Sequence, residues 1–145
     1  MKLSTRFVMA LALLFAPLVA SAQFKDLDQA LSSLSRGFGH GDARAIVAGI
    51  AENEQVVLRF PDLVTETGPF GRDQAQYLLD GLFKRVKPTG FEEVNSRKDG
   101  KEGQQHIVGR WTIMAAGKPQ ARDLYITLRI NGDHYSLLSV TSGSK

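Results

Sequence analysis

The three histidines of the chain are the first residues to test for metal or acid–base chemistry. They are His40, His106 and His134, and no pair has the HxH or HExxH spacing that places two imidazoles on one ion. The chain contains no cysteine, which excludes a disulfide framework, a thiolate nucleophile and a cysteine-rich metal site. The sequence therefore predicts no metal site and no cofactor.

Two further motifs contain residue types used in nucleophilic or phosphate chemistry. Ser32, Ser33 and Ser35 lack the G-x-S-x-G elbow that activates a serine. The alternating glycines of residues 37–41 lack the preceding strand and the following Lys-Ser/Thr of a phosphate loop. We interpret this stretch as a flexible connection, and Asp42 behind it as the N-cap of a short helix.

General acid–base catalysis requires a titratable side chain that points at the substrate. Two strand-like segments near the C-terminus alternate apolar and polar residues, so each should turn one row of side chains inward. The inward rows contain no ionisable residue: Ile107, Gly109, Trp111 and Ile113 on the first segment, and Leu124, Ile126, Leu128 and Ile130 on the second. We therefore predict no catalytic residue. A shift of one residue in the register would turn every side chain over.

The opposite face of the same two segments carries polar and aromatic side chains. Its candidate partner-binding residues are His106, Arg110, Tyr125 and Arg129. One interpretation is a solvated sheet face, which antiparallel sheets commonly have. The other is a contact surface for a second copy or another protein, because Tyr and Arg are enriched at interfaces.

Helices and strands that would position these residues follow from hydrophobic periodicity. Apolar residues at helical spacing predict a helix over residues 24–38, ended by the glycines at 37–41, and a second long helix over 72–86, ended by Pro88. Extended segments are predicted at 56–60 and 63–67, and then at 91–97, 104–114, 122–130 and 135–140. Without crossover helices among the last four, we expect an α+β fold with a curved antiparallel sheet wrapped around the long helix, with the N-terminal helices beside it.

Residues 1–22 have the pattern of a cleavable signal peptide. Lys2 and Arg6 precede an apolar run, and Ala20 and Ala22 frame an A-x-A cleavage site. The apolar run is short for a membrane span, so we expect export to the periplasm or the medium, with no membrane attachment after the leader is removed. One domain, residues 23–145, would remain. Its 16 Lys and Arg against 15 Asp and Glu give no reason to expect nucleic acid as a partner.

Several caps and turns together resemble a known family. These are the segments at 41–45, 56–60 and 71–75, the Gly109–Thr112 stretch and the Asn131-Gly132 turn. The chain resembles small exported bacterial proteins of a domain-of-unknown-function family in the nuclear-transport-factor-two-like (cystatin-like) superfamily. That resemblance implies a cone formed by sheet and helices, and sheet-face dimers are common among such proteins.

Two functions remain open from the sequence. The first is a non-catalytic envelope module that binds a small apolar ligand, a peptide or another protein. The second is a small hydrolase or isomerase that uses the cone as its pocket, as some members of the superfamily do. The second requires an inward acid or base, for which Tyr77, Asp80 and His106 are the candidates.

Overall fold

The computed structural model describes residues 23–143. The predicted leader and its cleavage residues Ala20 and Ala22 lie outside this range. Within it, none of the helices is long and apolar enough to cross a lipid bilayer.

Three helices and six strands follow one another within residues 23–143. The helices are α1 (Leu27–His40), α2 (Ala43–Val47) and α3 (Arg72–Arg85). The strands are β1 (Val56–Arg59), β2 (Gly68–Phe70), β3 (Lys87–Asp99), β4 (Gln104–Ala115), β5 (Lys118–Asn131) and β6 (His134–Ser142). The short strands β1 and β2 come before α3, and the four long strands follow it. The predicted α+β class is confirmed.

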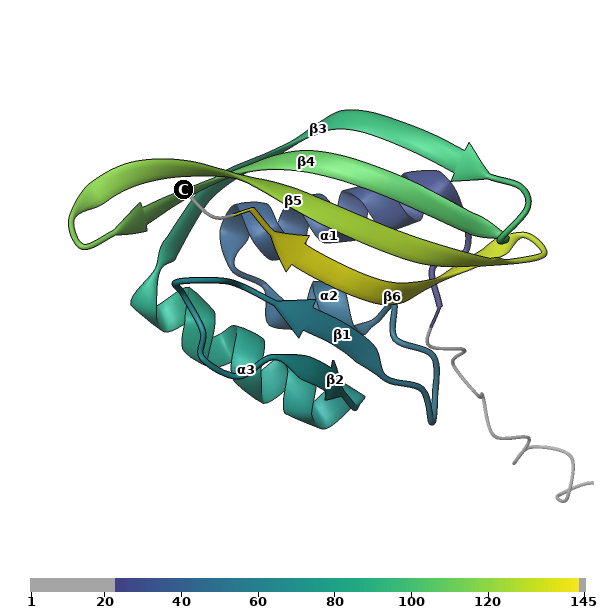
Figure 1. Ribbon diagram of the computed structural model, residues 1–145, viewed down its shortest axis with the longest axis horizontal. Coiled ribbons are helices and arrows are strands. Elements are labelled where there is room, and N and C mark those ends of the chain that lie inside the picture. The colour runs from purple at the N-terminus through teal and green to yellow at the C-terminus, as the bar shows by residue number, and fades with distance from the viewer. Residues whose placement is uncertain (1–22, 144–145) are drawn as a thin grey trace, which may run out of the picture.

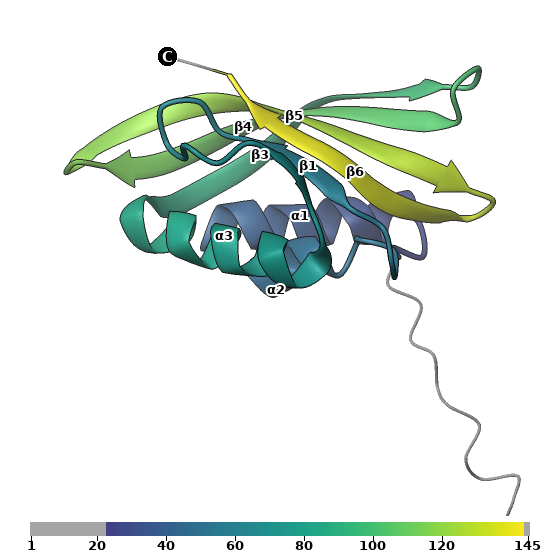
Figure 2. The same ribbon diagram turned by 60° about the horizontal axis from the view of Figure 1, so that its bottom comes forward.

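One curved sheet forms a layer of its own, in the order β2-β1-β6-β5-β4-β3. The helices lie together on one side of this layer (Figures 1 and 2). The other side of the sheet, called the outer face below, is not covered by any described helix. This is the expected cone, in which the concave face of the sheet and the helices share one core.

The predicted strand register is confirmed. On β4, Ile107, Trp111 and Ile113 are buried, and on β5 Leu124 and Ile126 are buried with their cross-strand neighbours. The alternation predicts these rows because successive side chains of a strand point to opposite faces. The inner row of β5 also contains a charged residue, Arg122, which the sequence analysis did not place there.

The sheet is not wholly antiparallel, which corrects the expectation. β1 runs parallel to β6, with Leu58 opposite Val140, whereas every other described strand pair is antiparallel. β1 and β6 lie far apart in sequence, with α3 and four strands between them. The expectation considered only strands joined by short turns, and such turns enforce antiparallel pairing.

The interpretation of residues 37–41 as a flexible connection is wrong. Helix α1 continues through Gly37 and Gly39 to His40, and Gly41 then ends it in the left-handed conformation. A Cβ atom on Gly37 would overlap Cγ1 of Ile46 on α2. The glycine therefore lets α1 and α2 approach closely, and the low helix propensity of glycine is outweighed by this packing.

Other predicted boundaries moved by a few residues. The extended segment expected at 63–67 is a loop, and the short strand β2 follows it at 68–70. Pro88 lies at the start of β3, directly after α3, and β3 is an edge strand, where proline is tolerated. The N-cap expected at Asp42 is confirmed, since its carboxylate accepts a hydrogen bond from the Ala45 amide at 3.4 Å.

Candidate functional site

The interior of the cone beside α1 is packed with aromatic rings. Trp111 on β4 is fully buried, and its ring lies edge-on to Phe38 with the centroids 5.7 Å apart. Phe60 and Phe83 also pack against Trp111, at centroid separations of 6.1 and 6.4 Å. The indole Nε1 donates a hydrogen bond of 2.8 Å to the carbonyl oxygen of Phe38. The most polar atom of this cluster is therefore already used within the protein.

Arg122 is the ionisable residue that the sequence analysis missed on the inner face. It is 7% exposed, and its Nη1 and Nη2 donate to the carbonyl oxygen of Pro61 at 3.1 Å and to Oε1 of Gln120 at 3.3 Å. It has no carboxylate partner within the described part of the chain. The inner row of β5 contains every second residue: Leu124, Ile126 and Leu128. The residue two positions before Leu124 should therefore belong to the same row, and that residue is Arg122. Its contact with Pro61 holds the segment that leaves β1.

None of the three candidate acids or bases lies in the cone interior. Tyr77 on α3 is 85% exposed, and Asp80 on the same helix is exposed as well. His106 belongs to the outer row of β4, where its Nδ1 lies 3.3 Å from Oγ1 of Thr127 on β5. His40 is exposed at the end of α1. These side chains are in positions to contact solvent or a partner rather than a substrate inside the cone.

The four residues predicted as a partner surface all belong to the outer face, but they do not form one cluster. Tyr125 is half-exposed in the middle of β5. Arg110 lies opposite Asp123 on β5 and opposite Glu92 on β3, in a row of alternating charge. Arg129 lies toward the other end of β5, where its Nη1 is 2.8 Å from Oε1 of Glu54.

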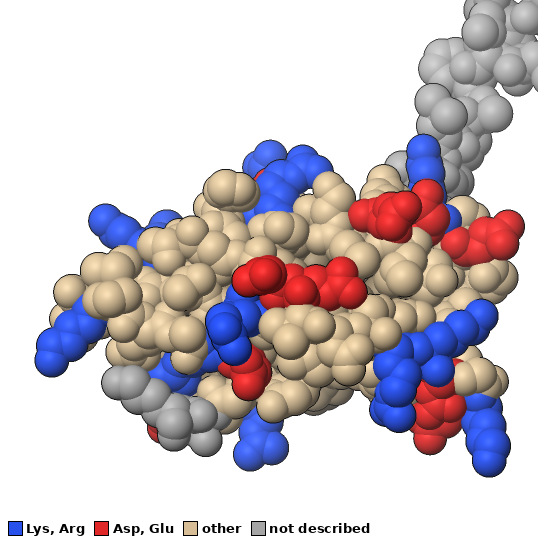
Figure 3. Space-filling model, turned by 90° about the horizontal axis from the view of Figure 1, so that it is seen from above, with Lys and Arg blue, Asp and Glu red and all other residues tan. Residues whose placement is uncertain are grey.

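Between these charged ends, the outer face is largely uncharged. Side chains opposite one another across β4, β5, β6 and β1 include Val108, Tyr125, Thr141, Thr127, Ser139 and Val57. Seen from above, the side on which β3 lies in Figure 1, acidic side chains form a short row in the middle of the view, and Lys and Arg side chains stand toward its ends (Figure 3). The outer face therefore carries a largely uncharged region around Tyr125 and Thr127, and Arg59 on β1 lies beside it, opposite Thr141.

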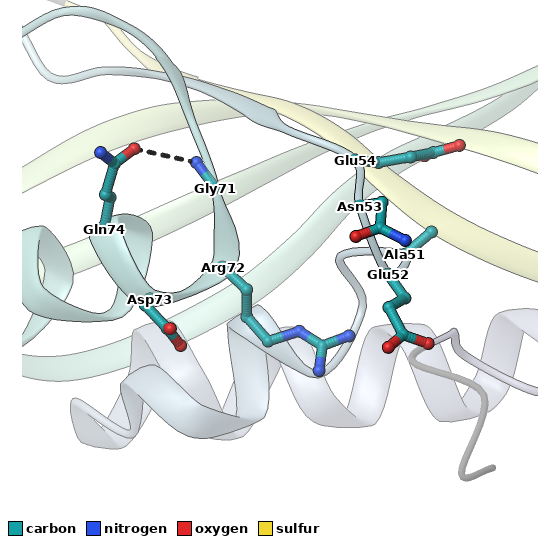
Figure 4. A pocket seen from close by; sticks show the side chains of 8 residues that line it. All are labelled: Ala51, Glu52, Asn53, Glu54, Gly71, Arg72, Asp73 and Gln74. Atoms are coloured by element: carbon teal, nitrogen blue, oxygen red, sulfur yellow. Dashed lines mark hydrogen bonds between the residues drawn. The ribbon is translucent and has the colours of Figure 1, made fainter.

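A small hollow of about 330 Å³ lies between the start of α3 and the loop before β1. Figure 4 shows Arg72 reaching from α3 across this hollow, while Glu54 points away from it. The Arg72 guanidinium donates to the carbonyl oxygen of Ile50 at 2.8 Å, and Gln74 accepts from the Gly71 amide at 3.3 Å. The polar groups of this hollow thus stabilise the contact between α3 and the loop before β1. No group of three metal-ligating side chains occurs among residues 23–143.

A larger open groove of about 960 Å³ lies on the solvent side of α3. One wall is the exposed face of α3, and the other is the segment from Val64 to Phe70 that contains β2. The residues lining it are Val64, Thr65, Glu66, Pro69, Phe70, Asp73, Gln74, Tyr77, Leu78, Gly81, Lys84 and Arg85. Sequence reasoning did not find this groove, because it assigned α3 only by the residues that the helix buries.

Comparisons with known proteins identify the fold. No protein-family model matches the chain, and no curated protein is significantly similar to it. Among solved structures, a DUF4783 family protein from Bacteroides ovatus is similar, with a TM-score of 0.60 and 14% identity. That alignment covers 77% of this chain and 91% of the other.

Two other similar structures belong to the same fold class. A nuclear-transport-factor-two-like protein of unknown function from Shewanella oneidensis has a TM-score of 0.59 and 17% identity, covering 82% of this chain and 97% of that one. A hypothetical protein from Catenulispora acidiphila with a ketosteroid isomerase-like fold, in complex with trimethylamine, has a TM-score of 0.61 and 13% identity, covering 80% and 85%.

These likenesses show a nuclear-transport-factor-two-like cone, as the sequence resemblance implied, and neighbours that include domain-of-unknown-function proteins. At such identities they establish the fold and leave the activity open, because this architecture carries enzymes and binding modules alike.

Proposed function

We propose that this protein is an exported, non-catalytic binding module that acts through the outer face of its sheet. The observation that carries the proposal is the difference between the inner and the outer face of the sheet. The inner face is filled by Trp111 and its phenylalanine neighbours, whereas the outer face leaves Tyr125 half-exposed between Val108 and Thr141. A substrate pocket needs space and a titratable group. Aromatic rings fill the described interior around Trp111, and the guanidinium opposite Trp111, that of Arg122, is held by Pro61 and Gln120.

A second copy of the chain is the partner that the outer face fits best. A two-fold axis in the plane of the interface, running across the strands near Tyr125, would set the Glu92–Arg110–Asp123 row of one copy over the Arg97–His106 row of the other. Glu92 of one copy would then face Arg97 of the other, and the side chains around Tyr125 would be buried. Burial of aromatic and β-branched side chains would supply most of the affinity, while the charges would set orientation.

The test is the oligomeric state of the purified protein in sedimentation velocity. We expect a dimer for the native chain, and at least about tenfold weaker dimerisation for the double variant Arg110→Glu with Arg129→Glu, because each outer face would lose two positive charges and gain two negative ones, so that the two faces repel. The matched control, Lys25→Glu with Arg36→Glu, makes the same change in net charge near α1 and should leave the dimer intact. If the outer-face variant leaves both the mass and every co-purifying protein unchanged, the proposal fails.

No observation favours the alternative of a small hydrolase or isomerase. Tyr77, Asp80 and His106 all lie outside the interior. The cone of this chain is therefore proposed as a scaffold.

A further inference from the structure

We propose that the groove between α3 and the Val64–Phe70 segment binds an anionic amphiphile, meaning a molecule with an apolar chain and one carboxylate, phosphate or sulfate group. This site lies on the helix layer, away from the outer face of the sheet, and it does not depend on the function proposed above. It rests on three features of the groove: its apolar surface, its charge polarity and the chemistry of its edge strand.

The apolar surface of the groove comes from both of its walls. Val64 is buried beneath it, and Phe70 and Leu78 are half-buried against the core. Tyr77 stands above them with 85% of its surface exposed, which is far more than an aromatic side chain normally leaves in water. A groove of about 960 Å³ with this lining falls in the size range of small-molecule sites.

The charges of the groove are separated along α3. Lys84 and Arg85 border the end formed by the last turn of the helix, and Asp73 borders the end formed by its first turn. Neither Lys84 nor Arg85 forms a salt bridge within residues 23–143. A guanidinium beside an ammonium is suited to bind a carboxylate, phosphate or sulfate. The acidic end would repel the same group, so the charge pattern fixes which way an anionic amphiphile lies.

The edge strand argues against an extended peptide as the occupant. β2 ends the sheet and borders the groove, so a peptide could in principle add to it as another strand. However, β2 has only three residues, and the middle one, Pro69, has no amide hydrogen to donate. Main-chain pairing would therefore contribute little, and a ligand held by apolar contact and one charged group fits better.

The length of the groove sets an expectation for the ligand. From Asp73 to Arg85 the helix rises about 18 Å at 1.5 Å per residue. A straight acyl chain whose head lies at Lys84 and Arg85 can run along Gly81, Leu78 and Tyr77 toward the acidic end. We expect affinity to rise about fourfold for each additional methylene that is buried, until the chain reaches that end.

The experiment is a fluorescence titration of the purified protein with 11-(dansylamino)undecanoic acid. Lys84→Glu with Arg85→Glu should weaken binding at least about tenfold, because two attractive contacts become repulsive. The matched control, Lys98→Glu with Lys101→Glu on the β3–β4 hairpin, changes the net charge equally and should weaken binding less than about twofold, because distant charges are screened. The methyl ester of the probe should bind to the native protein more weakly than the acid does, because it carries no charge for Lys84 and Arg85 to attract.

Three outcomes would overturn the inference. These are equal loss of binding in both charge variants, equal binding of the ester and the acid, or amide chemical-shift changes that avoid Tyr77, Leu78 and Gly81 when the probe is added. If an apolar peptide with an acidic end binds there more tightly than any of the acyl probes, the ligand class is wrong. Failure of dimerisation through the outer face would leave this result untouched, so the two proposals fall separately.

Discussion

Helix α3 separates two regions of opposite character. Its buried side, with Ala75, Leu79 and Leu82, joins the aromatic core around Trp111, where side chains fill the space. Its solvent side, with Tyr77 and Gly81, forms a wall of the open groove. In this chain, bulky aromatic residues occupy the interior, and the open groove lies on the solvent side of α3. The comparison teaches that a shared cone does not imply a shared pocket.

Among the tests of this contrast, Trp111→Ala should have the largest effect on stability. The variant removes a fully buried indole and its hydrogen bond to the Phe38 carbonyl oxygen, so we expect the free energy of unfolding to fall by about 3–5 kcal/mol. Urea denaturation followed by circular dichroism measures this loss. Added indole should restore part of it, because the cavity would then have a ligand of its own shape. A loss below about 1 kcal/mol would show that Trp111 is not packed as described.

Trp111→Phe separates packing from hydrogen bonding in the same place. It keeps most of the ring volume but leaves the Phe38 carbonyl oxygen without its donor. An unsatisfied buried acceptor costs about 1–3 kcal/mol, so this control should fall between the native protein and Trp111→Ala.

Two helical glycines offer a matched pair on the closed and open sides. In Gly37→Ala the new Cβ would overlap Ile46, and we expect a loss of about 1–3 kcal/mol from overpacking. In Gly81→Ala the new Cβ meets nothing, so the better helix propensity of alanine should raise stability by about 0.5–1 kcal/mol. Thermal unfolding of the two variants side by side checks the opposite signs. A gain from both would mean that α1 and α2 are not in close contact.

The same features show how much of the fold could be predicted from the sequence. Alternating apolar residues predicted the inner rows of β4 and β5, because burial of one face imposes a period of two. The low helix propensity of glycine led to the wrong prediction that the helix ends at Gly37 and Gly39. Helix propensity takes no account of tertiary packing, such as the close contact of Gly37 with Ile46, which leaves no room for a side chain. The parallel pairing of β1 with β6 is a long-range choice, and no short turn in the sequence signals it.

The candidate sites were less predictable than the fold. Arg122 could have been found by continuing the inner row of β5. The rings around Trp111 come from three separate parts of the chain, and only the folded chain brings them together. The groove was missed for a related reason. Its two walls are 64–70 and α3, and a polar helix surface by itself indicates only solvent.

The smallest expected effect belongs to Tyr77→Ala. Because 85% of Tyr77 is exposed, its removal should change the free energy of unfolding by no more than about 0.5 kcal/mol, measured by the same urea denaturation as for Trp111→Ala. Stability and binding should therefore separate at this position: the variant keeps the fold and loses affinity for the anionic probe. A fall of more than about 1 kcal/mol would mean that the tyrosine packs onto Leu78 and Phe70 in solution. The groove would then be closed by its own side chain, and the contrast between the two sides of α3 would disappear.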